Sequence, residues 1–245
     1  MHELTVLGRK YGTDKAGGRA GNHTFTERVY GPLFEKRKNE PLSLLEIGAG
    51  KVGGSHKMWK EYFTQGEIYC MDPFFLPDQD TTIEELEALG IQVIQGNQLR
   101  RDDLRSAATA SPDGYDYIID DAAHVPDAIQ LSLGMLFPAL KPGGFYIVED
   151  LATATRRGQN LEATNVNLGK LDSQGLMTER HTEEHILEES LEAYNRTNQW
   201  LSKTLTPTES AYLVDNIQEW IILDDGGRLK NICIIKKKSE RQHNG

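Results

Sequence analysis

Two short acidic clusters contain the residues with the clearest chemical potential. Asp120, Asp121 and His124 follow one apolar run, and Glu149 and Asp150 follow the next. Both runs are typical of buried parallel strands, and neighbouring strands lie ~4.8 Å apart. Carboxylates held at adjacent strand ends repel one another unless a cation binds or protons are taken up. Oxygen ligands suit Mg²⁺, so the clusters predict a magnesium site.

His124 lies just past the first of these strands, beside the predicted metal. A neutral imidazole at that position could take a proton from a substrate hydroxyl, which makes His124 a candidate general base. The competing interpretation is that His124 only caps the loop after the strand. Asp120 equally fits a turn carboxylate on a solvated loop.

A glycine-rich loop follows the first expected strand and opens a helix. Gly48, Gly50 and Gly53 form a G-x-G-x-x-G pattern, in which glycines allow a tight turn and the approach of a ligand to backbone amides. Asp72 ends the next strand, where a carboxylate can bind two ribose hydroxyls. NAD and S-adenosylmethionine (SAM) both contain this ribose, and a glycine turn without any ligand is a third interpretation.

Glu46 separates these cofactors, because it stands two residues before the first glycine. A carboxylate there can meet the ammonium group of SAM, whereas it would repel the pyrophosphate of a dinucleotide. A dinucleotide loop is also expected near the start of its domain. The sequence therefore favours SAM, and an NAD-dependent oxidoreductase stays as an alternative.

The elements that must position these residues alternate as strand and helix, which predicts a doubly wound α/β fold. Ligands of such sheets bind at the carboxyl ends of strands where the strand order reverses. The turn at Asp225-Gly226-Gly227 predicts a terminal antiparallel hairpin, so we expect a mostly parallel, seven-stranded sheet. Strands are expected at 42–47, 67–71, 92–94, 115–119, 144–148, 219–223 and 232–235.

Helical spacing of apolar residues predicts that the segments between the strands are helices. We expect residues 1–40 to form a helical segment that closes over the cofactor, and 41–245 to form the main domain with a lid at about 151–190. The segment from His181 to His185 matches an inverted zinc-protease pattern, but its polar surroundings favour a solvated helix face. Helices are expected at 24–36, 55–63, 82–89, 99–108, 128–137 and about 182–201.

Composition limits the classes of partner. A formal net charge of −10 over 245 residues argues against nucleic-acid binding through a general basic surface. No apolar run approaches the ~18 residues of a membrane helix, and the N-terminus has no apolar signal segment. We therefore expect a cytoplasmic protein that does not bind membranes. The N-terminal helices are a candidate surface for a homo-oligomer.

Four sequence blocks together resemble one known family. They are YGTDK at 11–15, LLEIGAG at 44–50 with Ser55 and MWKEYF at 58–63, YIIDDAAH at 117–124, and PGGFYIVED at 142–150. In this order they are similar to the metal-dependent class I SAM O-methyltransferases of the macrolide-sugar type, such as the mycinamicin and macrocin methyltransferases. The related rhamnose O-methyltransferases of polyketide pathways share the same blocks.

The resemblance implies a role for each matching residue. Asp121, Glu149 and Asp150 would bind Mg²⁺, and His124 would be the general base of methyl transfer to a hydroxyl. The acceptor would be a sugar or polyol moiety of a small natural product, as in antibiotic biosynthesis. The residues that would line SAM are Thr13, Glu46, Gly48, Ser55, Asp72 and Gln98.

Two departures from the family pattern accompany the resemblance. Ala122-Ala123 replaces the usual Gly-Ser, and Gly96-Asn97-Gln98 replaces the usual Gly-Asp-Gln. Cephalosporin hydroxylase-like proteins share the carboxylate pattern. A SAM-binding protein without methyl transfer is therefore an alternative function.

Overall fold

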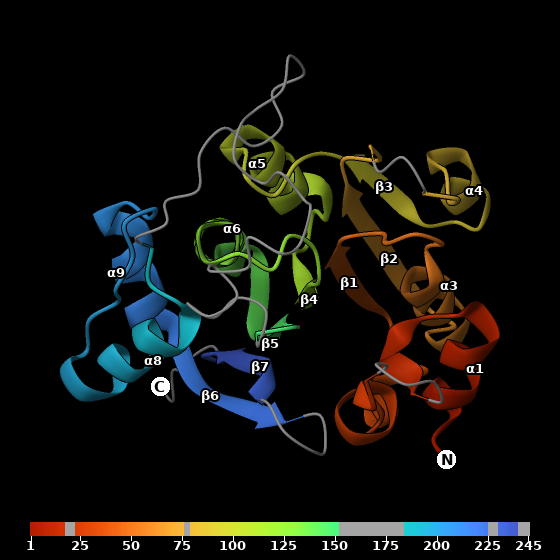
Figure 1. The fold of residues 1–245 in the computed structure, drawn as a ribbon, viewed down its shortest axis with the longest axis horizontal. Helices are drawn as coiled ribbons and strands as arrows, with labels where there is room; N and C mark the ends of the chain where they lie inside the picture. Colours follow the sequence, from red (N-terminus) through yellow and green to blue (C-terminus); the bar gives the residue numbers. More distant parts are fainter. Residues whose placement is uncertain (18–22, 76–78, 152–183, 225–229, 240–245) are drawn as a thin grey trace, which may run out of the picture.

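Seven strands form one sheet in the order β3-β2-β1-β4-β5-β7-β6 (Figure 1). The computed structural model describes residues 1–17, 23–75, 79–151, 184–224 and 230–239. Strands β1 to β5 pair in parallel, and β7 pairs antiparallel with both β5 and β6. The predicted doubly wound sheet with a terminal antiparallel hairpin is confirmed. The strands are β1 (Leu42–Ile47), β2 (Gly66–Asp72), β3 (Gln92–Gln95), β4 (Tyr115–Asp120), β5 (Leu140–Val148), β6 (Ile217–Asp224) and β7 (Lys230–Lys237).

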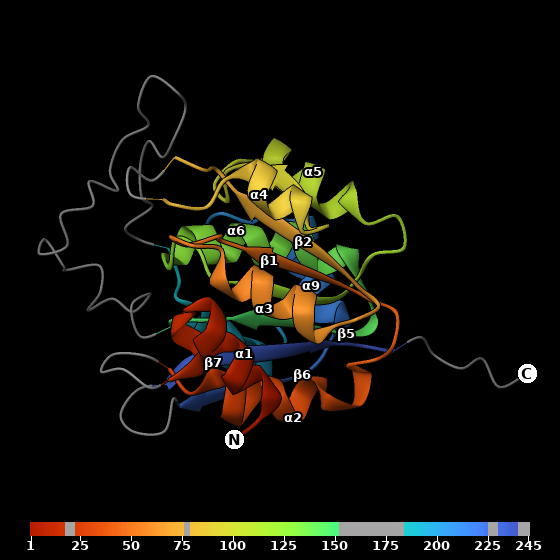
Figure 2. The ribbon, with the colours of Figure 1, turned by 90° about the vertical axis from the view of Figure 1, so that its right-hand side faces the viewer.

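Helices cover both faces of the sheet. Figure 2 shows α1 and α3 in front of the strands and α6 behind them. None of the helices in the described part of the chain combines the length and apolar character needed to cross a bilayer. The helices are α1 (Glu3–Tyr11), α2 (Gly31–Phe34), α3 (Gly54–Tyr62), α4 (Ile83–Ala88), α5 (Arg101–Ala110), α6 (Pro126–Leu136), α8 (Leu187–Thr197) and α9 (Pro207–Asn216).

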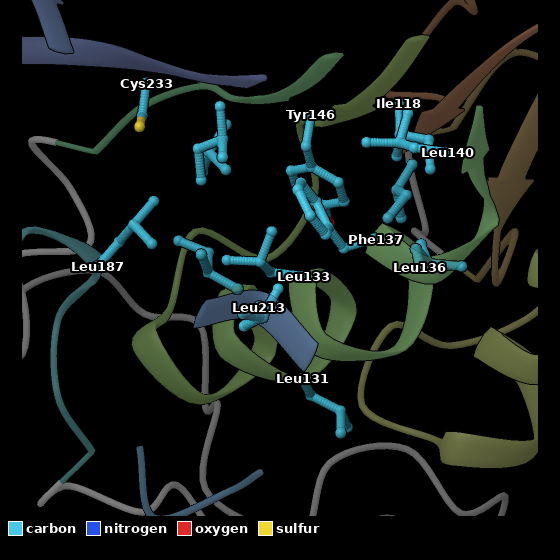
Figure 3. Close-up of a cluster of buried hydrophobic side chains, with 14 of the residues drawn as sticks. Ile118, Leu131, Leu133, Leu136, Phe137, Leu140, Tyr146, Leu187, Leu213 and Cys233 are labelled. Atoms are coloured by element: carbon cyan, nitrogen blue, oxygen red, sulfur yellow. The ribbon is translucent and has the colours of Figure 1, made fainter. Parts of the chain in front are cut away.

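The central strands are buried on both faces, which explains their continuous apolar sequences. Every residue of β1 and of β4 is buried. Alternate side chains enter two different clusters, because successive residues of a strand point to opposite faces. Leu45 packs in the cluster with α5, α6, α8 and α9, whereas Leu44 packs in the cluster with α1, α2 and α3. Figure 3 shows Tyr146 of the first cluster near Phe137 and Leu133, and Ile118 of the same cluster near Leu140.

The predicted helix at 24–36 is wrong as a single element. A short π-helical segment (Thr26–Tyr30) is followed by α2 and then by a 3-10 turn (Glu35–Arg37). Gly31 and Pro32 stand in the middle of the segment, and a proline has no backbone N–H and crowds the carbonyl one turn earlier. A regular helix therefore cannot continue through this point.

Several other boundaries also differ from expectation. The predicted helix at about 182–201 is observed as α8, which ends where Asn198 takes a left-handed conformation. Helix α9 was not predicted, although Thr206 and Glu209 form a capping box at its start. Residues 152–183, which include most of the expected lid and His181, lie outside the described residues, as does the Asp225-Gly226-Gly227 turn.

Candidate functional site

Backbone pairing brings the two acidic clusters together at one edge of the sheet. Asp120 is in register with Ile47 of β1 on one side and with Val148 of β5 on the other. Just past the strands, the Asp121 amide donates to the Ile47 carbonyl (3.1 Å) and the Glu149 amide to the Asp120 carbonyl (3.0 Å). This edge lies where the strand order reverses between β1 and β4, the usual ligand position in such sheets.

Asp121, His124 and Asp150 converge at this point. One ligand atom from each lies within 4.8 Å of the others. His124 Nε2 is 3.6 Å from Asp121 Oδ1 and 3.7 Å from Asp150 Oδ2. His124 and Asp150 have φ values of 48° and 55°, in the left-handed region that non-glycine residues rarely adopt. Such strained residues cluster at functional sites, where the surrounding structure holds them.

Glu149 lies beside this group but faces the N-terminal segment. Its Oε1 accepts a hydrogen bond from the Tyr30 hydroxyl, and its Oε2 is 2.9 Å from Lys15 Nζ. The side chain of Glu149 is buried. The structure therefore brings Asp121 and Asp150 together with His124, and places Glu149 where it first meets Lys15 and Tyr30. The role of Glu149 as a metal ligand stays a prediction.

The charges of the site are unbalanced toward the negative. Burial raises the pKa of Asp121, and it raises the pKa of Glu149 well above its usual value, although the charge of Lys15 opposes both shifts. Burial by itself would raise the pKa of Asp150 as well. The hydrogen bond with His23 and the charge of His124 outweigh burial, so the pKa of Asp150 is lowered. Clustered carboxylates of this kind favour a bound cation. The donor set fits a divalent ion such as Mg²⁺.

Glu46 offers a buried acceptor at the end of β1. Its side chain is fully buried, and Oε2 accepts a hydrogen bond from Trp59 Nε1 (2.9 Å). Oε1 is buried and accepts no hydrogen bond from any residue that the structure describes, with Lys15 Nζ 3.4 Å away. Buried carboxylate oxygens normally have a donor. The cation that this oxygen faces in the structure is Lys15, and its contact with the ammonium group of SAM stays a prediction.

Gly48 is required by the backbone itself. Its φ is +100°, and an added Cβ would lie 2.1 Å from the carbonyl oxygen of Asp121. The glycine loop therefore packs directly on the loop that carries Asp121 and His124. This contact explains the glycine without a ligand, and its contact with SAM stays a prediction.

The other predicted cofactor residues surround the same loops. Asp72 accepts hydrogen bonds from the amides of Ala49 (2.8 Å) and Phe74 (2.6 Å), so it links the glycine loop to the turn after β2. Thr13 caps the 3-10 turn of residues 14–16. A Cβ on Gly54 would lie 3.1 Å from the Thr13 amide, so Thr13 is next to the start of α3, where Ser55 is buried.

Asp120 and Gln98 support the loop that carries His124. Gln98 Nε2 donates to Asp120 Oδ1 (2.6 Å), and Gln98 Oε1 accepts from the Ala123 amide (3.1 Å). The hydroxyls of Ser132 and Tyr146 donate to the other oxygen of Asp120. Burial raises the pKa of Asp120 to about 6. The interpretation of Asp120 as a solvated turn carboxylate is wrong, and the contact of Gln98 with SAM stays a prediction.

Three residues of the site were not assigned a role from the sequence. Lys15 and Tyr30 contact Glu149, and His23 Nε2 is 3.1 Å from Asp150 Oδ1. The YGTDK block marked the surroundings of Lys15, but nothing distinguished its ammonium group from those of surface lysines. His23 and Tyr30 gave no signal, because their partners lie more than a hundred residues away in the chain.

Comparisons with known proteins identify relatives of this chain. The chain is 34% identical over 183 residues to mycinamicin VI 2''-O-methyltransferase of Micromonospora griseorubida, covering 70% of this chain and 43% of that protein. It is 35% identical over 193 residues to 8-demethyl-8-(2-methoxy-alpha-L-rhamnosyl)-tetracenomycin-C 3'-O-methyltransferase of Streptomyces olivaceus, covering 74% of this chain and 46% of that protein. The chain is homologous to sugar O-methyltransferases.

A solved structure agrees with these relatives. The MycE methyltransferase of the mycinamycin biosynthetic pathway, in complex with Mg, SAH and mycinamycin VI, matches 99% of this chain and 56% of its own. The match has a TM-score of 0.65 and 26% sequence identity, and it assigns the sheet to the class I methyltransferase fold. No family model matches the chain. The chain spans less than half the length of the curated sugar O-methyltransferases described above.

Proposed function

We propose that this chain transfers the methyl group of SAM to a hydroxyl of a sugar or similar polyol on a small natural product, with Mg²⁺ at the acidic cluster. The observation that carries the proposal is the convergence of Asp121, His124 and Asp150, with Lys15 Nζ linking Asp121 to the buried carboxylate of Glu46. The names of the sugar O-methyltransferase relatives support methyl transfer over the hydroxylase-like and NAD-dependent alternatives. A cytoplasmic location and assembly into a homo-oligomer stay predictions.

Each side chain has a defined task in this proposal. When bound, Mg²⁺ would supply a charge that orients two acceptor oxygens and lowers the pKa of the reacting hydroxyl, and SAM would supply the methyl group. Glu46 binds the ammonium group of the cofactor, and Asp121, Glu149 and Asp150 hold the metal. The imidazole of His124 takes the proton of the acceptor hydroxyl. The fixed loops after β1, β4 and β5 place these groups together, and positioning lowers the barrier.

The experiment starts from the purified full chain. Calorimetry should detect binding of SAM and none of NAD. With methyl-labelled SAM and a panel of glycosylated macrolides and rhamnosylated polyketides, label should appear in the acceptor, stop on chelation and return with Mg²⁺. Asp121→Asn and Asp150→Asn should abolish the labelling even when MgCl₂ is present. Full activity after exhaustive chelation, or binding of NAD without SAM, would contradict the proposal.

A further inference from the structure

The ammonium group of Lys15 is enclosed among carboxylates that belong to two different parts of the site. Its side chain is 1% exposed, and Nζ lies 2.9 Å from Glu149 Oε2 and 3.4 Å from Glu46 Oε1. It also donates a hydrogen bond to Asp121. Glu46 belongs to the proposed cofactor site, whereas Asp121 and Glu149 belong to the proposed metal site. The positive charge of Lys15 therefore interacts with carboxylates of both the proposed cofactor site and the proposed metal site.

Removing the positive charge from among these buried carboxylates would destabilise the fold. Buried carboxylates that lose their partner become uncompensated charges, and breaking such a pair is strongly destabilising. A divalent ion at Asp121 and Glu149 would meet the same requirement as the ammonium group. A bound ion would also lie close to Lys15 Nζ, and like charges at such distances repel one another in a poorly solvated site.

The backbone around Lys15 keeps its ammonium group near the carboxylates. The carbonyl oxygen of Lys15 accepts a hydrogen bond from the Thr26 hydroxyl (3.2 Å), and the His23 amide donates to the Asp14 carbonyl (2.9 Å). Ala16 packs so closely on α1 that a Cβ on Gly8 would lie 2.6 Å from the Ala16 Cβ. Since the turn is held on these sides, Lys15 Nζ can move away from a bound ion only by rotation of its own side chain.

We propose that Lys15 is a positioning residue, a tethered cation that holds Asp121, Glu149 and Glu46 in place before a divalent ion binds and that competes with this ion for the same carboxylates. The inference rests on the proposed function, because it takes Asp121 and Glu149 as metal ligands. It predicts two opposite effects of Lys15, which stabilises the metal-free fold and weakens the binding of the metal ion.

Two variants of the full chain test this, Lys15→Met and Lys15→Gln. The matched control is Lys10→Gln, which removes an exposed lysine of the same segment that pairs with Glu61. Melting temperatures are measured in EDTA and in MgCl₂, and the affinity for Mg²⁺ is measured by calorimetry. Both Lys15 variants should melt lower than wild type in EDTA and gain more from MgCl₂. Their affinity for Mg²⁺ should be at least about tenfold tighter, and the control should match wild type.

The outcomes separate this inference from the proposed function. Equal or weaker Mg²⁺ affinity in both Lys15 variants, with normal binding by wild type, overturns the competition while leaving the metal site intact. Failure of both variants to fold in EDTA and in MgCl₂ overturns it as well, because the ion would then not replace the ammonium group. No Mg²⁺ binding by wild type, Lys10→Gln or the Lys15 variants overturns the metal site itself. Variants that fold only in MgCl₂ support the competition.

Discussion

At the scale of single residues, we expect the loss of the His124 imidazole to lower turnover while leaving SAM and Mg²⁺ binding nearly unchanged. His124→Asn should lower turnover by roughly 10²–10⁴-fold, the usual effect of losing a positioned general base. Asparagine tolerates the left-handed backbone of this position, so the fold should persist. SAM affinity, Mg²⁺ affinity and turnover are measured on one sample. His185→Asn is the control, because His185 pairs with Glu189. A parallel loss of Mg²⁺ affinity would instead identify the imidazole as a metal ligand.

Asp120 makes a second prediction at the residue scale, on the pH dependence of stability. Burial raises the pKa of Asp120 to about 6 in the folded protein, against ~3.9 for an unperturbed aspartate. Its contribution to stability is therefore complete below about pH 4 and is lost as the pH rises through about 6, a change on the order of 3 kcal/mol. Wild type therefore loses this stability between pH 4 and pH 7, whereas Asp120→Asn has no carboxyl group to titrate. The difference in unfolding free energy, variant minus wild type, should rise by about this amount over the same pH range.

Urea unfolding at a series of pH values measures this difference. Asp102→Asn is the control, because the Asp102 side chain is 81% exposed. Parallel pH profiles of wild type and Asp120→Asn would contradict the raised pKa of this carboxyl group.

At the scale of elements, the glycine loop and the loop after β4 depend on each other through Gly48. Gly48→Ala places a methyl group against the Asp121 carbonyl, whereas Gly50→Ala meets no atom within 4 Å and carries only the ~1 kcal/mol cost of a left-handed alanine. Gly48→Ala should therefore cost at least twice as much unfolding free energy. It should also weaken Mg²⁺ binding, because Asp121 moves. Urea unfolding and calorimetry measure both effects, and equal costs for the two variants would contradict the contact.

At the scale of the whole molecule, the N-terminal segment is packed into the same core as the sheet. Phe34 is fully buried, with its ring edge-on to Trp59 of α3 and to Tyr117 of β4. Phe34→Ala should lower the unfolding free energy by about 3–5 kcal/mol, in a single transition. Phe75→Ala, at a half-exposed position, should change it by less than about 0.5 kcal/mol. A small effect of Phe34→Ala, or two separate transitions, would mean that the segment folds independently.

The sequence by itself determined where the strands lie along the chain, that most of them are parallel, and the edge at which Asp121, His124 and Asp150 meet. These follow from local rules, because apolar runs set the strands and parallel strands end together at one edge. Only the tertiary structure decided that Glu149 faces Lys15 and Tyr30, which are 134 and 119 residues away in the chain. It also decided that Asp120 is buried under Ser132 and Tyr146. The partner of a side chain depends on which distant elements pack together, and no local periodicity encodes that choice.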